Sequence, residues 1–152
     1  MAEKILIIDD DATMVNLLST VLEFEGYETR KALSGKEALE SIDGDLPDII
    51  LLDIMMPGMD GFEVLARLRG DARTERLPVI MLTARTEDRD IFEGWRRGAD
   101  EYVTKPFDPR ELVQAIKNVL ARSYEERLEE RAQHVEFLLH LIQKAGEQES
   151  GG

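Results

Sequence analysis

The chain has 152 residues, of which 43% are hydrophobic, and this suits one globular domain with a short appendage. It contains no Cys, which excludes disulfide bonds, thiolate metal sites and cysteine nucleophiles. Its formal net charge is −13 without any block of basic residues, so direct binding to nucleic-acid phosphates is not expected.

Strand and helix patterns alternate over the first 122 residues. The N-terminus enters a strand without a signal-peptide hydrophobic region, and no apolar stretch has the length of a membrane span. We therefore expect a cytoplasmic protein with no membrane insertion. The expected strands are 4–8, 27–32, 49–53, 77–83 and 101–104. The expected helices begin at Asp11 or Thr13, at Ser34, at Gly61, at Glu87 and at Pro109.

This alternation predicts an α/β fold, with a doubly wound parallel sheet of five strands covered by five helices on its two faces. The strand over 27–32 is short and polar, as an edge strand would be. In a sheet of this kind, ligands bind outside the carboxyl ends of the strands.

Polar side chains follow four of the apolar strands. Asp9 and Asp10 follow the first, Asp53 ends the third, Thr83 ends the fourth and Lys105 follows the fifth. Three carboxylates at one edge suit a hard cation such as Mg²⁺ or Mn²⁺, because such ions prefer oxygen ligands. A carboxylate beside that ion can attack a phosphoryl group, whose oxygens a hydroxyl and an ammonium would hold.

Asp11 extends the acidic run after the first strand. We expect it to cap the following helix rather than to bind metal, because Asp is a preferred N-cap residue.

Together these segments resemble the receiver domain of two-component response regulators, the CheY-like family, over residues 3–122. The resemblance is carried by Asp9-Asp10, Asp53 before Met56-Pro57-Gly58-Met59-Asp60-Gly61, Thr83-Ala84, Gly98-Ala99-Asp100 and Lys105-Pro106-Phe107. It implies the flavodoxin-like strand order 2-1-3-4-5.

The resemblance also implies a role for each residue of the site. Asp53 would accept a phosphoryl group from a histidine kinase or a phosphotransfer protein. The implied Mg²⁺ ligands are Asp9, Asp10, Asp53 and the backbone carbonyl of Met55. The residues implied to contact or sense the phosphate are Thr83, Ala84, Lys105 and the aromatic switch Tyr102.

Two residues are candidates for setting the lifetime of the phosphate. Met55 and Arg85 each lie two positions beyond a site residue, and there they would flank the path of a hydrolytic water. The chain would then be no enzyme beyond slow self-dephosphorylation.

The remaining residues form a tail, which we expect to be a helical extension of the fifth helix over 123–146 followed by disorder over 147–152. Apolar residues recur every seven positions, as in a coiled coil, but the second seam position stays open between two phases. The candidate interface residues are Leu128, Val135, Leu138, Leu139 and Ile142. Parallel homodimerisation is our first interpretation; docking on another protein or folding back on the receiver are the others.

Three functions remain in competition. The leading one is a phosphorylation-controlled switch that acts through protein contacts or dimerisation. The chain can also be the N-terminal receiver portion of a longer regulator whose effector domain is missing. A Mg²⁺-dependent phosphohydrolase with Asp53 as nucleophile is disfavoured, because no general acid follows two residues after Asp53.

Overall fold

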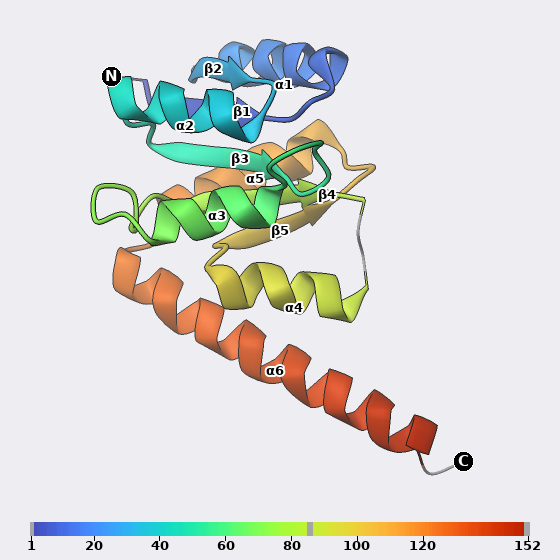
Figure 1. Ribbon diagram of the computed structural model, residues 1–152. Coiled ribbons are helices and arrows are strands. Elements are labelled where there is room, and N and C mark those ends of the chain that lie inside the picture. Colours follow the sequence, from blue (N-terminus) through green and yellow to red (C-terminus); the bar gives the residue numbers. More distant parts are fainter. Residues whose placement is uncertain (1, 85–86, 151–152) are drawn as a thin grey trace.

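The protein is a three-layer α/β domain with one additional helix along its side, as a computed structural model shows over residues 2–84 and 87–150 (Figure 1). Its sheet has five parallel strands in the order β2-β1-β3-β4-β5, which confirms the predicted order. The strands are β1 (Lys4–Ile8), β2 (Glu28–Ala32), β3 (Ile49–Asp53), β4 (Val79–Thr83) and β5 (Glu101–Thr104).

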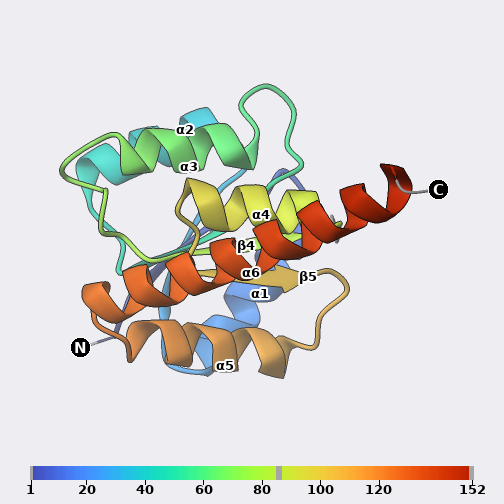
Figure 2. The same cartoon turned by 90° about the horizontal axis from the view of Figure 1, so that it is seen from below.

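Helices cover both faces of the sheet. They are α1 (Ala12–Phe24), α2 (Gly35–Gly44), α3 (Gly61–Arg69), α4 (Asp88–Arg97), α5 (Pro109–Leu120) and α6 (Tyr124–Ser150). Figure 2 shows α2 and α3 on one side of the sheet and α1 and α5 on the other. Successive strand side chains point to opposite faces, so Leu6 and Ile8 pack into one core while Ile5 and Ile7 pack into the other.

The helix starts follow the capping residues that the sequence contains. Asp11 accepts hydrogen bonds from the backbone N–H groups of Thr13 and Met14, which confirms it as the N-cap of α1. Ser34 caps α2 in the same way through the N–H of Glu37. These caps set where each helix begins after a strand, and so they shape the loops at the edge of the sheet.

The tail begins differently from its prediction: α6 is a separate helix and not an extension of α5. Ser123 accepts a hydrogen bond from the N–H of Glu126, and the Glu126 carboxylate accepts one from the N–H of Ser123. This reciprocal pair is a capping box, which starts a new helix after the end of α5 at Leu120. The chain turns there, and α6 runs back alongside α4 (Figures 1 and 2).

The end of α6 also lies beyond its predicted position. The helix continues to Ser150, although the sequence predicted disorder from Glu147; the last two residues of that segment lie outside the described residues. Among the described residues, no helix has the length and apolar character that crossing a membrane requires.

Candidate functional site

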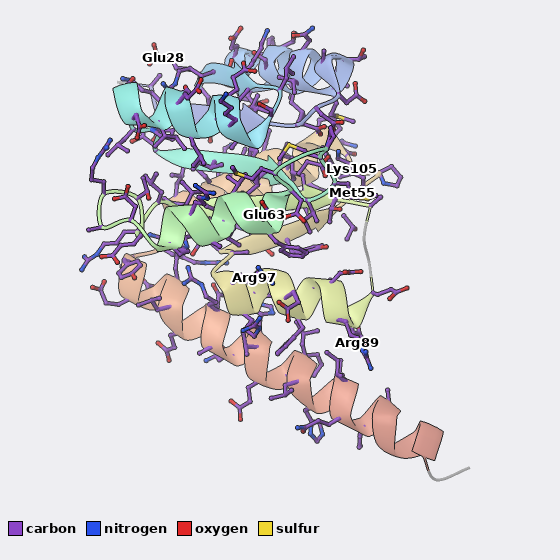
Figure 3. The ribbon with its side chains drawn as sticks, viewed as in Figure 1. Glu28, Met55, Glu63, Arg89, Arg97 and Lys105 are labelled. Carbon is purple, nitrogen blue, oxygen red and sulfur yellow. The ribbon has the colours of Figure 1, made fainter. Side chains whose placement is uncertain are left out.

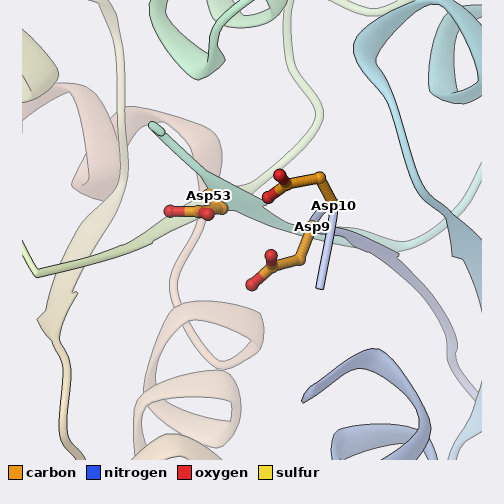
Figure 4. A group of neighbouring side chains, drawn as sticks. All are labelled: Asp9, Asp10 and Asp53. Atoms are coloured by element: carbon orange, nitrogen blue, oxygen red, sulfur yellow. The ribbon is translucent and has the colours of Figure 1, made fainter. Parts of the chain in front are cut away.

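The acidic residues predicted to form a site do meet at one edge of the sheet. Asp9, Asp10 and Asp53 each offer a carboxylate oxygen, and these oxygens lie within 4.8 Å of one another (Figure 4). Asp9 and Asp53 are buried, whereas Asp10 is exposed. Figure 3 places Lys105 and Met55 at the same end of the sheet. The site thus has two sheltered carboxylates and one that faces solvent.

The position of Asp53 depends on a close contact between α3 and the end of β3. The N–H of Gly61 donates a hydrogen bond of 2.9 Å to the carbonyl of Ile54. A side chain at Gly61 would overlap with the carbonyl oxygen of Asp53, so only glycine allows this approach. Gly58, with φ of 76°, makes the turn in the connecting loop. The Met-Pro-Gly-Met-Asp-Gly segment therefore has a structural role in presenting Asp53.

Lys105 is the cation of the site. Its Nζ donates a hydrogen bond of 2.8 Å to Oδ2 of Asp9 and lies 3.7 Å from Oδ2 of Asp53. Burial disfavours the ammonium, but its hydrogen bond to Asp9 and the charge of Asp53 outweigh burial and raise the pKa of Lys105. The backbone N–H of Lys105 also bonds to the carbonyl of Thr83 at 2.8 Å, which ties the end of β5 to that of β4.

Asp53 is held in an environment that disfavours its charge. Its pKa is raised to about 6, chiefly by burial and then by the negative charge of Asp9, while the attraction of Lys105 lowers it by less. The N–H of Met55 bonds to Oδ1 of Asp53 at 3.3 Å and favours the ionised form. When Asp53 is ionised, the site holds three negative charges, and Lys105 neutralises only one of them.

The donor set fits a small divalent cation. All three side chains offer carboxylate oxygens, and the exposed Asp10 leaves room for the waters that Mg²⁺ retains. The Met55 peptide lies at the site through its N–H bond to Asp53, while the role of its carbonyl as a ligand stays a prediction.

Thr83 and Tyr102, the two predicted switch residues, lie on neighbouring strands. Thr83 is fully buried at the end of β4, opposite Thr104 of β5. Tyr102 is half-buried on β5, and its ring lies so close to Gly94 of α4 that an added Cβ there would be 3.2 Å from two ring carbons. Its ring therefore touches α4.

The other predicted phosphate-site residues lie at the rim. Ala84 directly follows Thr83 and is exposed, and Met55 has an exposed fraction of 54%. Arg85, predicted with Met55 to influence phosphate loss, lies outside the described residues.

The chain matches the model of the response regulator receiver domain over residues 5–117. It belongs to this family. Among solved structures, the receiver is similar to a putative response regulator from Chloroflexus aurantiacus, with 43% identity and a TM-score of 0.77 over 80% of this chain and 100% of the other. The chemotaxis protein CheY4 of Vibrio cholerae matches with 33% identity and a TM-score of 0.75, over 78% of this chain and 99% of the other.

Curated relatives of the receiver are longer proteins. The DNA-binding response regulator MtrA of Mycolicibacterium paratuberculosis is 38% identical over 97% of this chain and 66% of its own length. The phosphate regulon transcriptional regulatory protein PhoB of Pseudomonas aeruginosa is 44% identical over 81% of this chain and 54% of its own length. The receiver thus spans between about half and two thirds of the length of these relatives.

The tail residues predicted to form an interface divide into two groups. Leu138 is buried and Val135 and Ile142 are half-buried, but Leu128 and Leu139 are exposed, with exposed fractions of 39% and 41%. The prediction considered only apolar positions. The positions of α6 that contact the receiver include Arg127, Arg131 and His134, which the prediction missed.

Proposed function

We propose that Asp53 accepts a phosphoryl group from a phosphohistidine of a sensor kinase or phosphotransfer protein. One observation carries this proposal: a buried carboxylate at the end of β3 faces an ammonium 3.7 Å away, in a chain that belongs to the receiver family. With a pKa of about 6, Asp53 is largely ionised at neutral pH and can act as a nucleophile.

In the transfer, a carboxylate oxygen of Asp53 forms a bond to phosphorus while the bond from phosphorus to the donor nitrogen breaks. The electron pair of the broken bond stays on the departing imidazole, and the product is an aspartyl phosphate. Lys105 would hold one phosphoryl oxygen as a point charge, and the backbone and hydroxyl at Thr83 and Ala84 would hold the others.

Asp9, Asp10 and Asp53 would hold Mg²⁺ or Mn²⁺ together with the Met55 carbonyl. When bound, such an ion supplies positive charge that offsets the repulsion among the carboxylates and the incoming phosphoryl oxygens. The closeness of the three carboxylates supports this assignment, and the pKa of Asp53 agrees with it: burial raises that pKa most, and the charge of Asp9 raises it as well.

Phosphorylation with a small phosphodonor tests the role of Asp53. The chain is incubated with acetyl phosphate and Mg²⁺, and intact mass is followed for the addition of one phosphoryl group. Asp53→Asn should abolish the addition, and chelation of Mg²⁺ should suppress it. Asp11→Asn is the matched control, since Asp11 caps α1 and should leave phosphorylation intact. Equal labelling of Asp53→Asn would overturn the assignment.

We also propose that the receiver is not an enzyme acting on free substrates, and that its phosphate is lost slowly. The exposed, apolar Met55 at the rim would hinder a hydrolytic water. Met55→Asn should speed phosphate loss in the same mass assay, and multiple turnover of a small phosphate ester would contradict the proposal.

For its output we propose contact with a second copy of the chain through α6. Leu128, Ala132, Val135, Leu139 and Ile142 follow each other at spacings of three and four, which is the seam pattern of a coiled coil, and three of them are exposed. Light scattering with Mg²⁺ and beryllofluoride, a mimic of the phosphoryl group, should show a dimer. Leu128→Ser with Leu139→Ser should return it to a monomer, and a monomer under all conditions would contradict this output.

The relatives support a second candidate, in which this chain is the receiver portion of a longer regulator. Two of them are named as a DNA-binding and a transcriptional regulator, and this chain spans only 66% and 54% of their lengths. The reading frame beyond Gly152 decides between the two candidates, because an effector domain encoded there would favour the longer regulator.

A further inference from the structure

A second cluster of charges lies at the opposite end of β5 from the phosphorylation site. Asp100, whose side chain is fully buried, lies within 3.1 Å of three guanidinium groups. One belongs to Arg69 of α3, and two belong to Arg127 and Arg131 of α6. Three guanidiniums around one carboxylate leave two surplus positive charges in a largely buried place.

The two oxygens of Asp100 serve different parts of the chain. Oδ2 accepts hydrogen bonds from the receiver itself, at 3.1 Å from Arg69 and at 2.9 Å from the N–H of Val79. Oδ1 is contacted by α6, at 2.9 Å by Arg131 and at 3.0 Å by Arg127. Half of this buried carboxylate is therefore an attachment point for the tail.

Further contacts of α6 surround this attachment. Arg131 donates to the carbonyl of Ala99 at 3.2 Å, and Arg127 donates to the carbonyl of Arg76 at 2.8 Å. On α4, Trp95 is only 3% exposed, and the imidazole of His134 stacks on its ring with centroids 4.0 Å apart. Polar and aromatic contacts thus hold α6 on the receiver together with the buried Leu138.

In the docked arrangement, the three guanidinium groups around Asp100 repel one another. The pKa of Arg69 is lowered to about 10, chiefly by burial; Asp100 raises it, and the charges of Arg131 and Arg127 lower it. Nη1 of Arg127 is buried and, although 3.0 Å from Asp100, it makes no well-directed hydrogen bond. A helix held in this way is easier to release than one held by an apolar seam, because water can solvate the freed charges.

β5 joins this attachment to the phosphorylation site. The strand has four residues; Asp100 precedes it and Lys105 follows it. Between them, the ring of Tyr102 touches Gly94 on the inner side of α4, and the next residue, Trp95, carries α6 on the outer side. One turn of α4 is therefore packed between Tyr102 and His134. A displacement of β5 or Tyr102 would move this turn and so disturb the surface on which α6 is docked.

We propose that α6 is a latch on the Trp95–Asp100 surface, and that phosphorylation of Asp53 releases it. This inference rests on the proposed function of Asp53. Without a phosphoryl group, α6 is docked and Lys105 is bound to Asp9. A phosphoryl group adds about two negative charges beside Lys105 and competes for it, which pulls on the end of β5. Release exposes Trp95 and one oxygen of Asp100 to solvent.

Trp95 is the single tryptophan of the chain, so its fluorescence reports the latch directly. The full chain is titrated with beryllofluoride and Mg²⁺ while emission wavelength and acrylamide quenching are recorded. Release predicts a red shift and stronger quenching as Trp95 loses its cover. Binding of beryllofluoride is followed separately by calorimetry.

Variants of the latch test the coupling from the other side. Arg127→Gln with Arg131→Gln should give the exposed Trp95 signal without beryllofluoride. Because coupling between two sites is reciprocal, this variant should also bind beryllofluoride more tightly, by about fivefold or more. Arg73→Gln with Arg110→Gln is the matched control, since it removes the same charge from two exposed ion pairs away from α6. His134→Ala, which removes the stack on Trp95 without touching an arginine, should change the Trp95 signal in the same direction by a smaller amount.

The outcomes separate the latch from the proposed function. If beryllofluoride binds by calorimetry but Trp95 stays equally shielded, the latch is overturned and the role of Asp53 stands. If the arginine variant binds beryllofluoride no more tightly than the control, the coupling is overturned. An absence of beryllofluoride binding to the unmodified chain would instead remove the proposed function, and the inference with it.

Discussion

The two ends of β5 carry charge clusters of opposite composition. At the carboxyl end, three carboxylates lie together and two of them pair with one ammonium; at the amino end, three guanidiniums surround one carboxylate. The first cluster opens to solvent at Asp10, whereas α6 closes the second. A cation from solution can therefore reach the open cluster and compensate its negative charge. In the closed cluster, the surplus positive charge has to be accommodated by the surrounding side chains and backbone.

Removing the central carboxylate of the closed cluster should have the largest effect on stability. Asp100→Asn keeps the shape but leaves three guanidiniums without a counter-charge, so we expect the free energy of unfolding to fall by about 3–5 kcal/mol. Urea denaturation measures this. In the open cluster, Asp10→Asn without Mg²⁺ should leave stability unchanged or raise it, since it relieves repulsion. Equal losses for both variants would contradict the comparison.

Mg²⁺ should stabilise the chain through the open cluster alone. At a concentration of 100 Kd, an ion that binds the folded state adds about 2.7 kcal/mol to the free energy of unfolding. EDTA should reverse the gain, and NaCl at matched ionic strength should not reproduce it. Asp9→Asn should lose most of the gain, whereas Asp100→Asn should retain it.

Asp53→Asn should stabilise the metal-free chain in a pH-dependent way. Because the folded-state pKa of Asp53 is raised to about 6, protonated Asp53 favours folding, and its contribution is lost as the pH rises through 6. The stability advantage of Asp53→Asn should be near zero at pH 4 and about 1–2 kcal/mol above pH 7. Denaturation with EDTA across this range checks the sign, and an advantage that is largest at low pH would contradict it.

Loss of the stacked ring should have the smallest effect. His134→Ala removes a parallel stack on Trp95, and we expect the docking of α6 to weaken by about 0.5–1.5 kcal/mol. Hydrogen exchange of the α6 amides measures this change. His134→Phe should restore the stack, and an effect of equal size for Phe and Ala would show that the stack does not hold α6.

The fold and the acidic site were predictable because both depend on local order in the sequence. Apolar runs of strand length, helical periodicity and caps such as Asp11 and Ser34 act within a few residues. Parallel strands then bring their carboxyl ends to one edge, so residues that follow each strand meet whatever their sequence separation. Asp9, Asp53 and Lys105 came together for that reason.

The break before α6 also had a local signal, which the prediction of a continuous helix overlooked. Ser123 and Glu126 have the spacing of a capping box, and in the structure they form one. The apolar residues that recur every seven positions in the tail favoured a continuous coiled-coil helix instead.

The amino-acid order was thus sufficient for the receiver fold, the acidic site and the existence of a helix in the tail. Where that helix lies was decided by tertiary packing. Arg127 and Arg131 look like solvent-facing charges in the sequence, and their partner Asp100 is about thirty residues away. Asp100 becomes buried only when the chain folds, and a buried carboxylate requires a compensating charge. Arg127 and Arg131 therefore lie on the face of α6 that packs on the receiver, whereas Leu128 and Leu139 are exposed.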